Sequence, residues 1–170
     1  MTILISIVVG FFVAIGAFFY YDSTTTSPTD TPSETRTNTN PPTSVPLTSV
    51  NRSGQNLTKM PADILAMTNL QQLDLSNNQL SGALPGEIRH LQNLQVLNIS
   101  NNKMTGLPAE LGQLLKLRIL NASNNQLTGI PHELGNLQNL EVLDLSGNTI
   151  SEFDLNEIRK KLPTSTQIVL

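Results

Sequence analysis

From Leu47 to the C-terminus, the chain is built from a motif that recurs every 23 or 24 residues. The clearest copies read LQQLDLSNNQL, LQVLNISNNKM, LRILNASNNQL and LEVLDLSGNTI. A unit this short cannot bury an apolar face on its own, so each unit must stack against its neighbours to build a continuous core. The repeat therefore predicts a solenoid. Its units begin at Leu47, Leu70, Leu94, Leu117 and Leu140.

The residue pattern inside each unit indicates its local structure. In the first half, apolar residues alternate with polar ones, as in a half-buried β-strand. One asparagine recurs at the same place in four units, and a buried amide there can bond backbone groups of its own turn and of the next turn. In the second half, a proline is followed by apolar residues three and four positions apart, which favours a short helical or 3₁₀ turn on the convex side.

The pattern LxxLxLxxNxL at this period resembles that of the leucine-rich repeat family. The resemblance covers residues 47–170 in about five units. It implies an α/β repeat solenoid, a horseshoe segment whose short parallel strands line a concave face. The spelling LSGALPGEI is similar to the 24-residue plant-type repeat, whereas LTGIPHELGNLQNL is closer to typical 23-residue units. In the family, the recurrent asparagine forms a structural ladder, and the matching residues here are Asn78, Asn102, Asn125 and Asn148.

Both ends of the repeat region depart from the pattern. Residues 47–69 form a degenerate first unit, in which Arg52 replaces a strand leucine, and this predicts a polar N-terminal cap. Residues 151–170 predict a helical C-terminal cap, because Ser151 and Asp154 fit a capping box. The closing TQIVL predicts one last strand. The residues expected to cover the terminal edge are Phe153, Ile158 and Leu162.

Two further segments precede the repeats. Residues 1–21 end in a run of 19 residues without a charge, and a helix of that length spans about 28 Å, close to the ~30 Å hydrocarbon core of a bilayer. We expect a transmembrane helix that acts as a signal anchor. A cleaved signal peptide is the alternative, although it should have a basic start and an A-x-A-like cleavage site. Residues 22–46 contain nine Thr, four Ser and five Pro, which predicts a disordered stalk.

The charges around the apolar run indicate its orientation. No Lys or Arg precedes it, Asp22 follows it, and the first basic residue after it is Arg36. The positive-inside tendency then favours a cytoplasmic N-terminus. We expect a single-pass protein of the cell membrane with an exterior C-terminal domain, or a secreted one if the segment is cleaved. Extracellular family members of animals and plants usually have cysteine-stapled caps, so the absence of cysteine points to a bacterial envelope protein.

Outward-facing strand residues should form three columns on the concave face, where members of this family usually bind partners. These columns are the candidate ligand contacts. The first column contains Gln72, Val96, Ile119 and Val142; the second contains Asp74, Asn98, Asn121 and Asp144; the third contains Ser76, Ser100, Ser123 and Ser146.

The residue inventory argues against catalysis. The carboxylates of Asp74 and Asp144 lie three predicted strands apart, about 14 Å at ~4.8 Å per strand, whereas glycosidase carboxylate pairs need roughly 5–9.5 Å. The chain has no cysteine and only two histidines, His90 and His132. Its net charge of −3 and pI near 5.3 argue against nucleic-acid binding. We expect no catalytic residue, no metal and no cofactor.

These observations favour a non-enzymatic, membrane-anchored protein that binds a protein or a cell-surface polymer through its concave face. Interface hot spots favour Trp, Tyr and Arg, which this face lacks, so the contact should be weak, polar or multivalent. Two alternatives remain open. The chain is a structural spacer whose strand edges associate weakly end to end, or, if its topology is reversed, a cytosolic regulatory scaffold.

Overall fold

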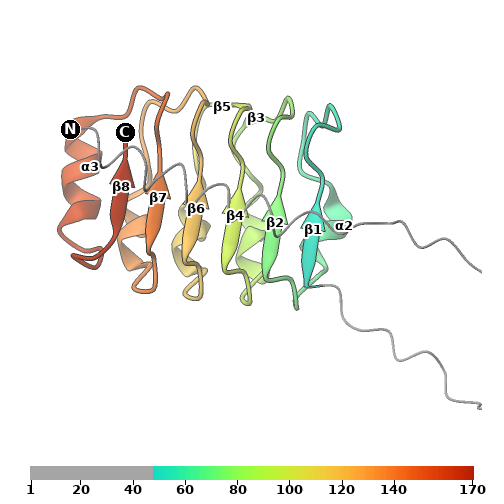
Figure 1. Ribbon diagram of the computed structural model, residues 1–170, viewed down its shortest axis with the longest axis horizontal. Coiled ribbons are helices and arrows are strands. Elements are labelled where there is room, and N and C mark those ends of the chain that lie inside the picture. The colour runs from blue at the N-terminus through green and yellow to red at the C-terminus, as the bar shows by residue number, and fades with distance from the viewer. Residues whose placement is uncertain (1–47) are drawn as a thin grey trace, which may run out of the picture. The chain divides into compact units, whose positions relative to one another are not determined.

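The computed structural model describes residues 48–170. Six short strands form one parallel sheet in the order β1-β2-β4-β6-β7-β8, so each strand pairs with the strand of the next unit (Figure 1). All five pairings are parallel and in register. The expected solenoid of stacked units with parallel strands is confirmed. The strands are β1 (Ser49–Asn51), β2 (Gln72–Asp74), β4 (Val96–Asn98), β6 (Ile119–Asn121), β7 (Val142–Asp144) and β8 (Gln167–Val169).

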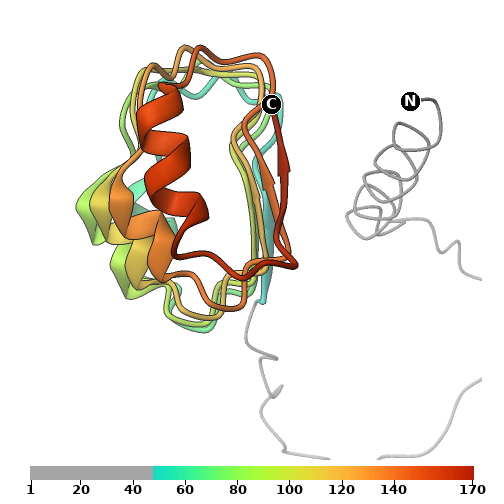
Figure 2. The same ribbon diagram turned by 90° about the vertical axis from the view of Figure 1, so that its left-hand side faces the viewer.

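The core lies between the sheet and the turns that return the chain to the next strand. Viewed along the stack, the units superpose around a common interior (Figure 2). The central residue of each inner strand points into this interior, and Leu73, Leu97, Leu120 and Leu143 are all fully buried. The core is almost entirely aliphatic, because the alternating strand pattern and the apolar residues of the return turns meet there.

Short helical turns form the opposite side of the units, as the proline pattern predicts. Each of the first four begins directly after a proline whose φ lies between −63° and −74°. Proline fixes φ near that value and needs no N–H partner there, so it defines where each turn starts. The elements are α2 (Ala62–Leu65), three 3₁₀ turns η1 (Gly86–His90), η2 (Ala109–Gln113) and η3 (His132–Asn136), and the longer α3 (Glu152–Arg159).

A second, two-stranded sheet lies on one rim of the stack. Its strands are β3 (Ser81–Gly82) and β5 (Lys103–Met104), paired in parallel (Figure 1). β3 belongs to the unit that is one residue longer than those after it, and Gly82 there has a φ of 73°. A positive φ is costly for residues with a Cβ, so the plant-type spelling of this unit has a structural basis.

The C-terminal cap confirms the expected helix and last strand but corrects two details. Ser151 precedes α3 without a side-chain capping bond, and the Asp154 carboxylate instead accepts a 3.4 Å bond from the backbone N–H of Ile130. Phe153 does not cover the terminal edge; it is 67% exposed. Ile158 of α3 and Leu162, just after the helix, are buried as predicted. They lie three and seven residues beyond the buried Leu155, on one face, and Phe153 lies off that face.

The predicted membrane segment, residues 1–21, and the predicted stalk, residues 22–46, lie outside the described residues. Within residues 48–170, every helix is too short or too polar to cross a bilayer.

Candidate functional site

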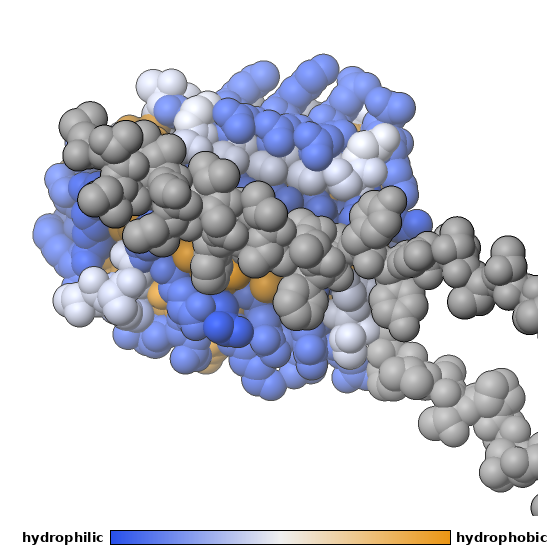
Figure 3. Space-filling model, in the orientation of Figure 1, coloured by the Kyte–Doolittle hydropathy of each residue, from blue (hydrophilic) through white to orange (hydrophobic). Residues whose placement is uncertain are grey.

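The sheet register places the predicted contact residues in straight rows. Gln72, Val96, Ile119 and Val142 are successive partners across the strands, so the first column runs across the sheet without a break. The second column is formed in the same way by the last residue of each strand. Where this face is visible in Figure 3, hydrophobic patches lie between two hydrophilic rims. The structure therefore brings the columns together on one surface.

The second and third columns are bonded to each other. In each unit, a side-chain oxygen of the Asp or Asn at the strand end accepts a bond from the backbone N–H of the serine two residues later. For Asp144 and Ser146 the N···O distance is 2.9 Å, and the serine Oγ donates a second bond of 2.7 Å. Such local bonds turn the backbone where a strand ends. These residues thus have a structural role in addition to any contact with a ligand.

Exposure differs from residue to residue within each column. Gln72, Val96 and Asn98 are half-buried, whereas Ile119 and Val142 are each 7% exposed. Ser146, after β7, is also half-buried, and the remaining column residues are buried. Three of the four column residues open to a partner therefore lie on β2 and β4. Val96 is the apolar residue of the first column that a partner can reach there.

The four recurrent asparagines link neighbouring units through their amides. Asn102 is representative: its Nδ2 donates 3.0 Å bonds to the carbonyls of Leu75 in the preceding unit and Ile99 in its own. Its Oδ1 accepts a 2.9 Å bond from the N–H of Leu80. Asn125 and Asn148 repeat this pattern one unit further on each time. The Asn78 amide likewise reaches the first unit, where it donates to the Arg52 carbonyl.

Sequence reasoning missed one recurrent position. The residue just before each ladder asparagine has a left-handed backbone, with φ of 55°, 54°, 52° and 69° at Asn77, Asn101, Asn124 and Gly147. Asparagine and glycine are the residues that adopt this conformation most easily. The signal was present in the sequence, because the spellings SNN and SGN place only Asn or Gly at this point.

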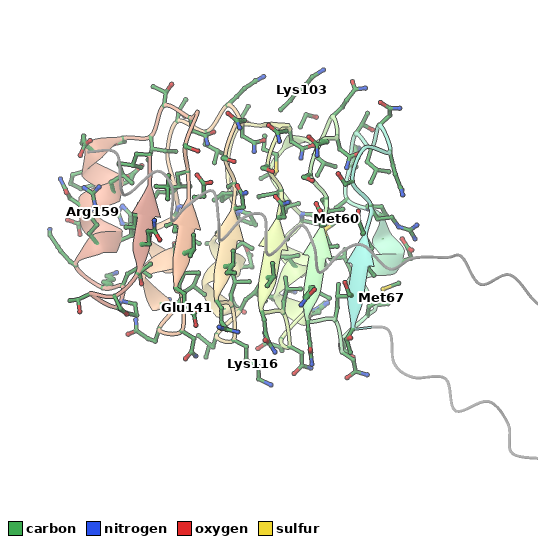
Figure 4. All side chains as sticks on the ribbon, in the orientation of Figure 1. Met60, Met67, Lys103, Lys116, Glu141 and Arg159 are labelled. Carbon is green, nitrogen blue, oxygen red and sulfur yellow. The ribbon has the colours of Figure 1, made fainter. Side chains whose placement is uncertain are left out.

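The ion-paired and histidine side chains of the described region are not members of the columns. Arg118 and Glu141 form a two-bond ion pair with N···O distances of 2.8 and 3.0 Å, on the rim where Glu141 and Lys116 are labelled in Figure 4. The hydrogen bond and then the charge of Glu141 raise the pKa of the Arg118 guanidinium. His132 has Nε2 3.4 Å from a carboxylate oxygen of Asp154 and its ring centroid 6.0 Å from that of Phe153.

Three features together define a leucine-rich repeat solenoid. Each strand pairs in parallel with the strand of the next unit, each unit has a return turn, and an amide ladder joins the units. The family model described as a leucine-rich repeat region matches residues 60–162, which is more than half of the chain. The chain therefore belongs to the leucine-rich repeat family. No curated protein matches it closely enough to count as a relative.

Solved structures of the same fold come from bacteria and plants. A leucine-rich repeat protein of Leptospira interrogans is 42% identical with a TM-score of 0.62, over 66% of this chain and 28% of that protein. The ectodomain of the receptor kinase SOBIR1 from Arabidopsis thaliana is 31% identical with a TM-score of 0.57, over 71% of this chain and 66% of that one. The chain thus spans less than a third of the Leptospira protein that it matches.

A third similar structure contains a bound partner. It is the ectodomain of the plant membrane receptor kinase GASSHO1/SCHENGEN3 from Arabidopsis thaliana, in complex with CASPARIAN STRIP INTEGRITY FACTOR 2. It is 34% identical with a TM-score of 0.55, over 66% of this chain and 14% of that one.

Proposed function

We propose that the protein is a non-enzymatic binding module that contacts a protein or a cell-surface polymer through the concave columns. The observation that supports this most directly is the unbroken register of Gln72, Val96 and their partners across the sheet. Similar solved structures include an ectodomain in complex with CASPARIAN STRIP INTEGRITY FACTOR 2 and the BIR3–SERK2 complex of Arabidopsis thaliana. A regular row of side chains on a rigid sheet suits an extended partner better than a small molecule.

Site-specific photocrosslinking on intact cells tests this proposal. A photoreactive residue at position 96 should give adducts with a partner. The same residue at position 115 is the control, because Leu115 is apolar and 55% exposed but lies outside the columns. Adducts from position 115 with none from position 96 would contradict binding through the concave face.

We further propose that residues 1–21 anchor the domain in the cell membrane and that residues 22–46 hold it away from the bilayer. The support is the uncharged run of 19 residues and the Thr-, Ser- and Pro-rich composition that follows it. Protease treatment of intact cells expressing a C-terminally tagged chain tests the orientation. Loss of the tag from the membrane fraction is expected. A protected tag would reverse the topology and favour a cytosolic scaffold.

A second candidate function is end-to-end association as a structural spacer. It is favoured by β1 and β8, each of which pairs on one side only with a strand of the described residues. The other edge of each strand presents backbone groups to which another parallel strand could bond. Concentration-dependent light scattering separates the two functions, since a spacer of this kind should grow with concentration and a binding module should stay monomeric.

A further inference from the structure

An apolar hollow of about 240 Å³ opens on the rim that includes β3. Its floor is made by the buried side chains of Leu80, Leu84 and Met104, which come from two successive units. Lys59 and Ala83 are exposed at its edge. Figure 4 labels Met60, a further lining residue contributed by the first unit. None of the lining residues belongs to the concave columns, so this hollow is separate from the surface of the proposed function.

The hollow lies where the sequence departs from its own repeat. Lys59 occupies a position that is glycine in two later units, and Met60 one that is otherwise Leu or Ile. Met104 likewise stands where the flanking units have leucine. The unit that contributes Ala83 is also the one with an additional residue. The fold does not need these changes, because the neighbouring units stack without them.

The size of the hollow limits what it can hold. An apolar cavity of about 150 Å³ is enough for a benzene ring, whereas sites for drug-sized ligands start at about 300 Å³. The hollow thus suits one large aliphatic or aromatic group. Methionine adapts its shape readily, and two of the four methionines of the chain, Met60 and Met104, line it. The floor can therefore adjust to groups of different shape.

The charge at the edge adds a second requirement. Lys59 forms no ion pair with another of residues 48–170, whereas several other basic side chains there do. Lys103, on β5, bonds only the amide oxygen of Gln79, at 3.4 Å. An ammonium group without a carboxylate partner beside an apolar hollow favours a ligand that combines an apolar group with a negative charge.

We propose that this hollow, here called the rim pocket, binds a large apolar side chain of a protein partner that has a carboxylate next to it, as a C-terminal leucine or phenylalanine does. The apolar group lies on Leu80, Leu84 and Met104, and the carboxylate pairs with Lys59. The partner thereby gains a site independent of the concave columns.

Methyl NMR on the full-length chain, labelled with ¹³C at the methionine methyls, tests the rim pocket. The probes are N-acetyl-phenylalanine and its neutral amide. Both should shift the Met60 and Met104 signals, and the acid should bind roughly two- to five-fold more tightly, as expected for an exposed ion pair. Met67 does not line the pocket, so its signal should stay in place. Equal shifts of all three methionines, or none, would overturn the proposal.

Two substitutions separate the apolar part from the charged part. Lys59→Gln should remove the preference for the acid while leaving amide binding intact, and Lys116→Gln, on the other rim, should change neither. Ala83→Leu should fill the pocket and abolish the shifts with both probes. Thermal unfolding of each variant verifies that it is folded. If Lys59→Gln retains the preference for the acid, the assigned role of Lys59 is wrong; this result leaves the concave-face proposal untouched.

Discussion

Asparagine serves three different purposes within a stretch of five residues in this protein. In one unit, Asn98 turns the chain at the strand end, Asn101 adopts a left-handed backbone, and Asn102 joins two units. The ladder could be anticipated from the sequence, because its asparagine recurs once per unit. The left-handed position also recurs once per unit but was not anticipated. A recurrent asparagine does not reveal whether its side-chain hydrogen bonds or its backbone conformation is what the fold requires.

The adjacent residues Asn101 and Asn102 allow a direct comparison. Asn101→Gly should leave stability nearly unchanged, whereas Asn101→Ala should cost about 1–2 kcal/mol because a Cβ disfavours the left-handed backbone. Asn102→Ala should cost more, about 2–4 kcal/mol, because it removes the partner of the buried Leu80 N–H and one of the two amide bonds to the Leu75 carbonyl, which keeps its bond from Asn78. Urea unfolding measures all three. A loss at Asn101→Gly equal to that at Asn101→Ala would contradict the backbone explanation.

At the scale of the elements, the return turns pack closely enough to require glycine at particular places. A Cβ on Gly112 would lie 2.2 Å from the backbone oxygen of Glu133 in the next unit, so η2 and η3 touch there without a side chain between them. Sequence reasoning predicted the turns from their prolines. It could not predict this contact, nor that Asp154 of α3 would reach back to Ile130, because both depend on a neighbouring unit 21 to 24 residues away.

Two glycines of the same unit test this packing. Gly112→Ala should destabilise the protein by about 1–3 kcal/mol, since backbone cannot move aside as a flexible side chain would. Gly106→Ala is the control, because its Cβ would meet nothing within 4 Å and its φ is not positive. It should be neutral or stabilise slightly, by up to about 1 kcal/mol. The midpoints of urea unfolding distinguish the two variants. Similar midpoints would show that η2 and η3 move apart at little cost to make room for the added Cβ.

At the scale of the whole described region, each unit gains its stability from the units on either side. In the last unit that the structure describes, α3 replaces the 3₁₀ turn of the preceding units and buries Leu155 and Ile158, and Leu162 is buried just after the helix. The sequence predicted that a helix would close this end, because proline is replaced there by a helical pattern. It was right about Ile158 and Leu162 and wrong about Phe153, since an aromatic residue in the first turn does not reveal which face of a helix turns inward.

Two double variants in the C-terminal cap test how much this cap contributes to the stability of the other units. Leu155→Ala with Ile158→Ala should lower the free energy of unfolding by about 4–8 kcal/mol, which approaches the whole stability of a typical domain. Asn156→Ala with Lys160→Ala changes the exposed side of the same cap and should cost less than about 1 kcal/mol. Calorimetry of the full chain compares them. Unfolding restricted to the last unit, with the other units intact, would show that the units are independent.

The ladder also determines how the molecule responds to force. Its amides join each unit only to an adjacent unit, so a pull between the two ends of residues 48–170 loads these connections one after another. Each unit that yields releases about 23 residues, or at most roughly 80 Å of extended chain. We therefore expect the described region to lengthen under force in steps of about this size and to absorb work at each one.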